Sequence, residues 1–288
     1  MYQVIKDYRD NKELRRSFNE LAGATFGLDF EDWYQNGFWS DNYNPYSIVI
    51  DGKVVSNVSV NKTDMLIDGE VKHFLQLGTV MTDEAYRNRG LSRRIMEEID
   101  KDYAGKVDGI YLFGNDNVVE FYPRFGFVKG VEYLYTKKVS LTGEAQVEQV
   151  VMNHQAMWQQ LTDAMDRSVF RGKMDMVKNN ELIMFYVSKF MQENVYYHKA
   201  SDTYVIAEVE ENSLLIHNVF SSTLTNLDDV IALFGRDIQN VILGFTPLNV
   251  EGYKIENYHE EDCNFFVKGA VFEMMESEKL RIPSLAHA

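Results

Sequence analysis

The sequence predicts an α/β protein (α+β, with mixed sheets) that has two domains, and three observations lead to this fold class. The chain has 288 residues, which corresponds to about two domains. Hydrophobic residues make up 45% of it, too many for a disordered chain. Residues 47–139 and 203–267 both read as hairpin, helix, strand and strand pair, which indicates a weak internal duplication. We therefore expect domains at residues 1–140 and 195–288, joined by a helical connector at 141–194.

The first half begins with a short strand and a helix within residues 4–22, where apolar side chains recur at helical spacing. Alternating apolar residues on both sides of Asp51-Gly52 and Asp68-Gly69 predict two successive hairpins. The other elements expected in this half are a helix at 91–103, a strand at 109–113, a helix at 118–125 that stops at Gly126, and a strand pair at 127–139.

The second half repeats this order after a mostly helical stretch at 141–192. Its expected elements are strands at 203–209 and 213–220, a helix at 227–234, a strand at 240–245, and a final strand pair at 253–258 and 264–267.

The composition excludes several classes of protein. A net charge of −15 argues against a broad basic face for nucleic acid. The single cysteine, Cys263, can form neither an internal disulfide nor a multi-thiolate zinc site, and the six histidines lack the spacing of metal ligands. No stretch approaches the roughly 20 apolar residues of a membrane helix, and residues 1–10 lack the apolar core of a signal peptide. We therefore expect a cytoplasmic protein without a metal, a nucleic-acid partner or a membrane partner.

The charge is unevenly divided between the two halves. Residues 1–140 hold 18 basic and 22 acidic residues, a net charge of −4, whereas residues 141–288 hold 11 and 22, a net charge of −11. A site for a polyanion is therefore expected in the first half.

Four arginines lie within residues 87–94, between an apolar strand and a helix. Gly90 permits backbone angles that other residues avoid, and the first N–H groups of the helix point back at the loop. This combination suits a pyrophosphate. The alternative is a solvated helix start whose arginines pair with acidic residues of the same helix. The four arginines are Arg87, Arg89, Arg93 and Arg94.

The segment Arg87-Asn88-Arg89-Gly90-Leu91-Ser92 resembles the acetyl-CoA signature [RQ]-x-x-G-x-[GA] of the GNAT family of N-acetyltransferases, with the small Ser92 in the last position. The later segment from Asn115 through Phe121-Tyr122 to Gly126-Phe127 resembles the second motif of that family. The resemblance covers residues 1–140 and is strongest to the N-terminal domain of multi-domain, Eis-like members. The second half, which lacks the Arg/Gly loop, resembles a degenerate second GNAT-like domain.

The resemblance implies a GNAT acyl-CoA N-acyltransferase fold, in tandem with that degenerate domain, and a site for acetyl-CoA. The strand before the loop should diverge from the next parallel strand, and the pantetheine arm should pair with the exposed backbone. A backbone N–H there can also stabilise the oxyanion. The implied cofactor-binding residues are Val80, Met81, Thr82, Arg87, Asn88, Arg89, Gly90, Leu91, Ser92 and Asn115.

The resemblance also implies that Tyr122 is catalytic, because its hydroxyl can protonate the departing thiolate of coenzyme A. The alternative for Tyr122 is an aromatic residue that packs on Phe125, and the alternative for Asn115 is a turn residue at a strand end. A general base is not assigned. The strand at 74–78 has no carboxylate, and Glu31 and Asp32, like Asp83, are equally well explained as solvated residues.

The acceptor is expected to be a cationic amine, such as an amino sugar, a polyamine or a lysine side chain. The aromatic segment 26–46 either lines its pocket or forms a hydrophobic cluster over a sheet edge. The predicted function is acetyl-CoA-dependent N-acetyltransfer to a primary amine by direct attack. The alternative is a non-catalytic acyl-CoA-binding regulatory or assembly module. The degenerate half would wall the acceptor cleft or mediate homodimer formation.

Overall fold

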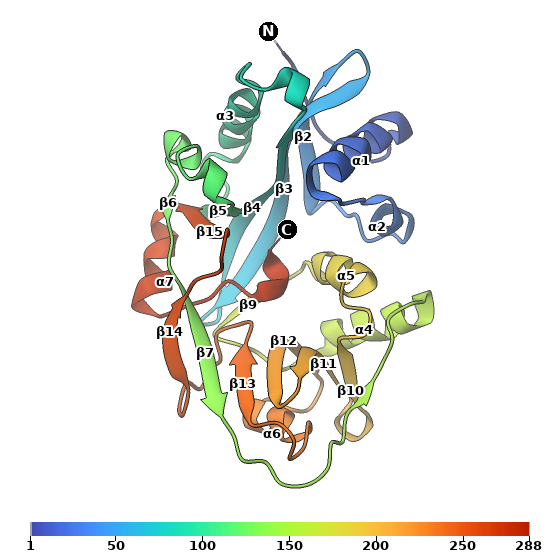
Figure 1. Cartoon of the computed structure of the whole chain (residues 1–288), viewed down its shortest axis with the longest axis vertical. Helices are drawn as coiled ribbons and strands as arrows, with labels where there is room; N and C mark the ends of the chain where they lie inside the picture. The colour runs from blue at the N-terminus through green and yellow to red at the C-terminus, as the bar shows by residue number, and fades with distance from the viewer. Residues whose placement is uncertain (1, 288) are drawn as a thin grey trace.

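The computed structural model describes residues 2–287, which form two mixed β-sheets arranged along the long axis of the molecule (Figure 1). The helices are α1 (Lys12–Phe26), α2 (Glu31–Gln35), α3 (Leu91–Tyr103), α4 (Gln155–Arg167), α5 (Asn180–Lys189), α6 (Leu227–Ala232) and α7 (Glu273–Ser277). The strands are β1 (Val4–Ile5), β2 (Tyr43–Ile50), β3 (Lys53–Ile67), β4 (Glu70–Thr82), β5 (Gly109–Gly114), β6 (Val128–Lys129), β7 (Glu132–Lys138), β8 (Glu148–Gln149), β9 (Met174–Val177), β10 (Val195–His198), β11 (Thr203–Glu210), β12 (Ser213–Ser221), β13 (Asn240–Leu243), β14 (Lys254–Tyr258) and β15 (Asn264–Lys268).

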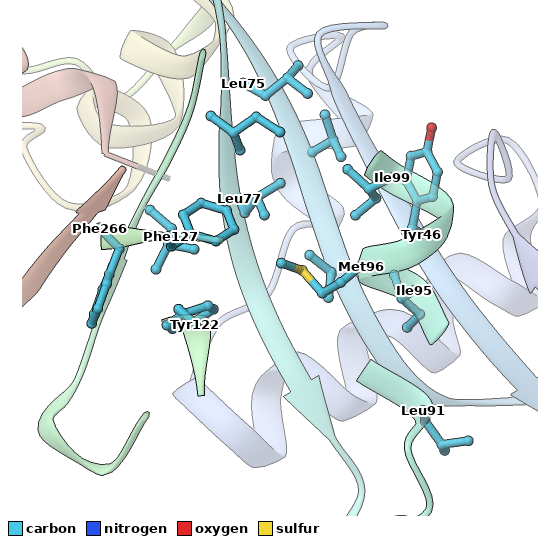
Figure 2. Packing of buried hydrophobic residues seen from close by; sticks show 14 of the residues in the cluster. Tyr46, Leu75, Leu77, Leu91, Ile95, Met96, Ile99, Tyr122, Phe127 and Phe266 are labelled. Carbon is cyan, nitrogen blue, oxygen red and sulfur yellow. The ribbon is translucent and has the colours of Figure 1, made fainter. Parts of the chain in front are cut away.

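The first sheet has the order β1-β2-β3-β4-β5-β15-β6, with β9 paired to the far end of β3. Its only parallel pair among the described strands is β4 with β5. Helix α3 covers one face of this sheet, and α1 and α2 cover the other (Figure 1). Apolar residues at helical spacing on α3, among them Ile95 and Ile99, pack on Leu75 and Leu77 of β4 (Figure 2).

The second sheet has the order β14-β7-β13-β12-β11-β10-β8, and its parallel pair is β12 with β13. Helix α6 follows β12 as α3 follows β4. The two sheets thus share a sequence of elements: an antiparallel hairpin, a helix, a strand parallel to the second hairpin strand, and an antiparallel strand beyond it. This arrangement supports the internal duplication that the sequence indicates.

Each sheet takes strands from the other half of the chain, and besides β9 the first sheet includes β15. Strand β15 lies between β5 and β6 in the first sheet, and β7 lies between β13 and β14 in the second. The predicted strand pairs at residues 127–139 and 253–267 are therefore wrong, because the two strands of each predicted pair belong to different sheets. The domain limits at residues 140 and 194 stay a prediction, although the strand pairing crosses both.

Two other expectations need correction. Residues 118–125 form no α-helix; instead, short 3-10 helices occupy Asp116–Val118 and Tyr122–Phe125. Pro123 has no N–H to give to a longer helix, and Gly126 ends the segment with a left-handed φ of 83°. In the connector, α4 and α5 are separated by β9, which pairs with β3. The helix expected at 91–103 is confirmed with these limits.

No helix within residues 2–287 is long and apolar enough to cross a membrane. In the same part of the chain, no group of three or more His, Cys, Asp or Glu side chains is arranged to hold a metal ion.

Candidate active site

Strands β4 and β5 pair over only part of their lengths. The parallel register joins Phe74–Leu77 to Gly109–Leu112 and then ends, whereas β4 continues to Thr82 and β5 to Gly114. The two strands therefore separate after Leu77. Backbone groups on the last residues of β4 have no partner on β5, as the predicted pantetheine site requires.

A β-bulge interrupts β4 where the separation begins. On β3, Ser59 is opposite Gly78 and Asn57 is opposite Met81, so that two residues of β4 face one residue of β3. These two residues are Thr79 and Val80. Within residues 2–287, neither has a partner in the register of either neighbouring strand. Thr79 has a φ of 42°, a conformation that is unfavourable for a β-branched residue.

A hydrogen-bonded group of buried polar side chains surrounds the bulge. The Thr79 hydroxyl donates to Ser59 Oγ at 2.5 Å and bonds the Tyr43 hydroxyl at 2.8 Å. Asn57 Nδ2 donates to the carbonyl oxygen of Thr79 and to Ser59 Oγ, both at 2.9 Å. Burial raises the pKa of Tyr43 to about 12, so it stays a neutral donor or acceptor here.

The residues of this polar group are not among those predicted from the sequence to form the site. Its signal is the run Val55-Ser56-Asn57-Val58-Ser59, in which polar residues interrupt an apolar strand, and all five positions are buried. Buried amides and hydroxyls need partners, and these partners come from β2 and β4.

The loop after β4 leads into α3. Asn88 and Gly90 have left-handed φ values of 63° and 73°, and Gly90 is the residue that precedes the helix. The first hydrogen bond of the helix runs from Arg94 N–H to Gly90 O at 3.1 Å. The N–H groups of the first turn before it are therefore available to an anion at this end of α3. Leu91 is buried and anchors the loop in the core.

Two of the four arginines have carboxylate partners. Arg87 Nη1 lies 3.2 Å from Glu84 Oε1, and Arg94 Nη2 lies 3.0 Å from Glu98 Oε2. Of these two, only Arg94 pairs with an acidic residue of the same helix, as the alternative of a solvated helix start expects.

Arg89 and Arg93 are exposed and have no carboxylate partner among the described residues. Arg89 donates to the carbonyl of Ala85 at 2.8 Å, and its guanidinium lies 4.8 Å from the centre of the Tyr86 ring. A cation that is held by a carbonyl and a ring keeps its full charge for an anionic ligand.

Ser92 replaces the Gly or Ala of the motif, and the structure gives this replacement a role. Its Oγ lies 3.0 Å from Oγ1 of Thr82, which in turn bonds Ser56 Oγ at 2.8 Å. The carbonyl of Thr82 also accepts a bond from Arg87 Nε at 3.3 Å. Ser92 therefore ties the start of α3 to the last residue of β4.

Tyr122 lies against the end of β5. Its ring packs on Phe127 and Phe266, with ring centroids 6.0 and 5.3 Å apart (Figure 2). A Cβ at Gly114 would lie 2.9 Å from Tyr122 Cε2. Within residues 2–287, the Tyr122 hydroxyl has no hydrogen-bond partner, and burial raises its pKa to about 12. The phenol is therefore protonated at neutral pH and free to donate.

The remaining candidates lie outside the gap. Asn115 caps the short helix after β5, where its Oδ1 accepts from Asn117 N–H at 3.1 Å, as in the turn alternative. Glu31 is bonded by Arg15 at 2.8 Å, which lowers the pKa of its carboxyl. Asp83 accepts from Ala85 N–H at 2.9 Å. None of these observations identifies a general base.

The aromatic segment forms part of the core. Trp33, Trp39 and Tyr43 are each at most 5% exposed and pack with Phe30 and Phe185. Of the two alternatives for residues 26–46, the structure shows the hydrophobic cluster. The cluster supports the face of the first sheet that is opposite α3.

Comparisons with known proteins agree with this architecture. Residues 10–130 match the family model described as the acetyltransferase (GNAT) domain. No curated protein matches the chain.

Three solved structures share its fold. A conserved protein of unknown function from Enterococcus faecalis V583, described as a "probable N-acyltransferase", is 16% identical, with a TM-score of 0.62 over 96% of this chain and 74% of the other. Eis1 from Mycobacterium abscessus is 12% identical, with a TM-score of 0.56 over 92% and 73%. A GCN5-related N-acetyltransferase from Kribbella flavida is 14% identical, with a TM-score of 0.55 over 92% and 71%. At these identities the likeness concerns the fold, and the family model supplies the assignment. The chain therefore carries, at residues 10–130, a domain of the GNAT acetyltransferase family.

Proposed function

We propose that the protein transfers the acetyl group of acetyl-CoA to a primary amine by direct attack. The family uses acetyl-CoA as co-substrate, which supports this donor. The observation that carries the proposal is that three features meet at one end of the first sheet: the open ends of β4 and β5, the Arg/Gly loop, and Tyr122 against Gly114.

In the proposed reaction, the pyrophosphate of coenzyme A binds the first turn of α3 and the arginines of the loop, and the pantetheine arm lies along the unpaired end of β4. The amine nitrogen attacks the thioester carbon, so that a C–N bond forms and the C–S bond breaks. The acceptor loses one proton to solvent before the attack and a second one after it, Tyr122 gives its proton to the sulfur, and solvent returns a proton to Tyr122. The products are the N-acetyl amine and coenzyme A.

The corresponding opening in the second sheet supports a single donor site. Strands β12 and β13 pair only as far as Ile216 and Leu243. Beyond that point Ser284, near the end of the chain, donates its N–H to Gly244 O at 2.7 Å, and its Oγ lies 2.8 Å from His217 Nδ1. The chain itself fills this opening. The acidic residues at the start of α6 would also repel a pyrophosphate.

The acceptor is proposed to be a cationic amine, on the basis of the acidic chain. A non-catalytic acyl-CoA-binding module is the second candidate, because residues 74–78 of β4, which lead to the bulge, include Gln76 and no carboxylate.

The decisive experiment separates binding from turnover. Calorimetric titration with coenzyme A should show binding that is lost in Gly90→Glu, whose carboxylate would enter the phosphate site. Release of the free thiol across a panel of amino sugars, polyamines and lysine peptides should show turnover, and Tyr122→Phe should reduce it about 10²-fold or more. Absence of coenzyme A binding to the wild type overturns the proposal. Binding without turnover on any amine favours the non-catalytic module.

A further inference from the structure

The side chain of Asn57 is fully buried on β3 and faces the bulge of β4. Its Nδ2 donates to the carbonyl oxygen of Thr79 at 2.9 Å and to Thr79 Oγ1 at 3.3 Å. Its Oδ1 accepts from Ser47 Oγ at 2.8 Å. The orientation of the amide is fixed from both ends, because a carbonyl can only accept and Ser47 gives its proton to Oδ1.

The hydrogen-bonded chain behind Asn57 is complete. The Tyr8 hydroxyl lies 2.6 Å from Ser47 Oγ, and since Ser47 donates to Asn57, Tyr8 donates to Ser47. Tyr8, Ser47 and Asn57 are all buried. A buried polar chain needs every partner in place, whereas apolar side chains would fill the same space without that requirement. Asn57 Nδ2 donates to Ser59 Oγ, to Thr79 Oγ1 and to one backbone atom, the carbonyl oxygen of Thr79.

The conformation of Thr79 explains why that atom needs a fixed partner. Its φ of 42° is unfavourable for a β-branched residue and persists only where surrounding contacts hold it. The bulge also leaves Thr79 and Val80 outside both sheet registers in the described chain, so the ladder does not fix the direction of the peptide that joins them. The Asn57 amide is the group that does.

A trans peptide is planar, and its C=O and N–H bonds point in opposite directions. If Asn57 holds the carbonyl of Thr79 toward β3, the N–H of Val80 points away from β3, on the side where β4 has separated from β5. We propose that Asn57 is a positioning residue, which aims the Val80 N–H at the thioester carbonyl of the bound donor. This inference rests on the proposed function, since it assigns a task to the site that binds acetyl-CoA.

Different residues therefore determine coenzyme A binding and the rate of acetyl transfer. The loop and α3 hold the pyrophosphate, and Asn57 touches neither. Loss of the Asn57 amide leaves the Thr79 carbonyl without its hydrogen-bond donor and lets the peptide between Thr79 and Val80 flip. The flipped peptide would present the carbonyl oxygen of Thr79, in place of the Val80 N–H, to the developing oxyanion. A donor aimed at an oxyanion contributes to the rate far more than to substrate binding.

The test uses acetyl-CoA that carries ¹³C at the thioester carbonyl, and difference infrared spectra of its complex with the full chain. In the wild type, the carbonyl band should lie below that of free acetyl-CoA, because a hydrogen bond weakens the C=O bond. In Asn57→Leu, which has a similar volume and no donor, the band should return toward the free position. We expect kcat to fall about 10²-fold, as for loss of an oxyanion donor, while the Kd for coenzyme A changes less than about twofold.

Asn61→Leu is the matched control. Asn61 is equally buried on the same strand and bonds Asn179, away from the bulge. It should keep the shifted band and the rate. If Asn57→Leu does not fold, Ser47→Ala removes a single hydroxyl from the chain, and its carbonyl band should be less shifted than that of the wild type.

The outcomes separate the two proposals. Failure of the wild type to bind acetyl-CoA overturns the proposed function. Binding with an unshifted band, or a shifted band and unchanged kcat in Asn57→Leu, overturns the positioning role and leaves the function intact. If only Ser47→Ala folds, an unchanged band in that variant overturns it likewise.

Discussion

The ring of Tyr122 lies beside Gly114, the last residue of β5, and leaves no room for a side chain at residue 114. A Cβ built there would lie 2.9 Å from Cε2 of Tyr122 and 3.0 Å from Cγ2 of Val118. Both distances are shorter than ordinary van der Waals contact. The position of Tyr122, the proposed proton donor, therefore depends on a glycine at the end of β5, where β5 has separated from β4.

Gly114→Ala should displace Tyr122 and lower kcat about tenfold or more, because proton transfer requires the hydroxyl within hydrogen-bond reach of the sulfur. Binding of coenzyme A, which depends on the loop, should change little. The measurement is steady-state transfer together with calorimetry. Gly23→Ala on α1 is the control, because its Cβ would meet only Leu28 O at 3.7 Å. An unchanged kcat in Gly114→Ala would contradict the role of Tyr122.

Arg89→Ala should weaken coenzyme A binding about tenfold, which corresponds to about 1.4 kcal/mol, because an exposed guanidinium without a carboxylate partner is free for phosphate. The affinity of the wild type should also fall as salt is raised, and that dependence should be smaller in the variant. Arg16→Ala on α1 is the control, since α1 lies on the face opposite α3 (Figure 1). Equal affinities of Arg89→Ala and wild type would exclude Arg89 from the site.

Glu132 should make stability depend on pH. Burial raises its pKa to about 7, against 4.5 as the ordinary value, although Arg281 and the Ile282 N–H act in the other direction. The native state therefore retains this proton where the unfolded chain has lost it. The contribution is fully present below the unfolded pKa and is lost as pH rises through about 7.

Glu132→Gln should thus exceed the wild type in free energy of unfolding by about 3 kcal/mol at about pH 8 and differ little at about pH 4. Urea unfolding across this range measures the difference. Glu256→Gln, a half-exposed carboxylate on β14, should leave the pH dependence unchanged. A wild-type stability that does not fall between these pH values would show that Glu132 is ionised in the native state.

The exchange of β7 and β15 should make the two sheets unfold together. Phe266 of β15 is fully buried in the core of the first sheet, beside Tyr122 (Figure 2). Phe266→Ala should cost about 3–5 kcal/mol. It should shift the tryptophan fluorescence transition, which reports largely on Trp33 and Trp39, together with the far-ultraviolet circular dichroism transition. Val128→Ala, at a side chain that is 63% exposed, is the control. Two separate transitions in the wild type would show that the sheets fold independently.

Local features of the sequence were sufficient for much of the fold. The Asp-Gly pairs at 51–52 and 68–69 marked both turns of the long hairpins, and the apolar stripe of α3 marked its limits. The Arg/Gly loop could also be predicted, because its arginines and glycine are adjacent in the chain. The exchange of strands could not be predicted from the sequence. The short strands around residues 130 and 260 have the same alternation of side chains whichever strands they pair with.

The sequence by itself determined that the first half carries a GNAT-like loop and motif, and that the second half lacks them. Only the tertiary structure decided which residues surround the opening between the ends of β4 and β5. Asn57 and Thr79 are 22 residues apart and meet across two strands, and their contact depends on a bulge that shifts the register by one residue. Phe266 reaches the core beside Tyr122 from the opposite half of the chain. Periodicity and motifs report on neighbours in sequence, whereas such contacts depend on which strands pair and where the ladder breaks.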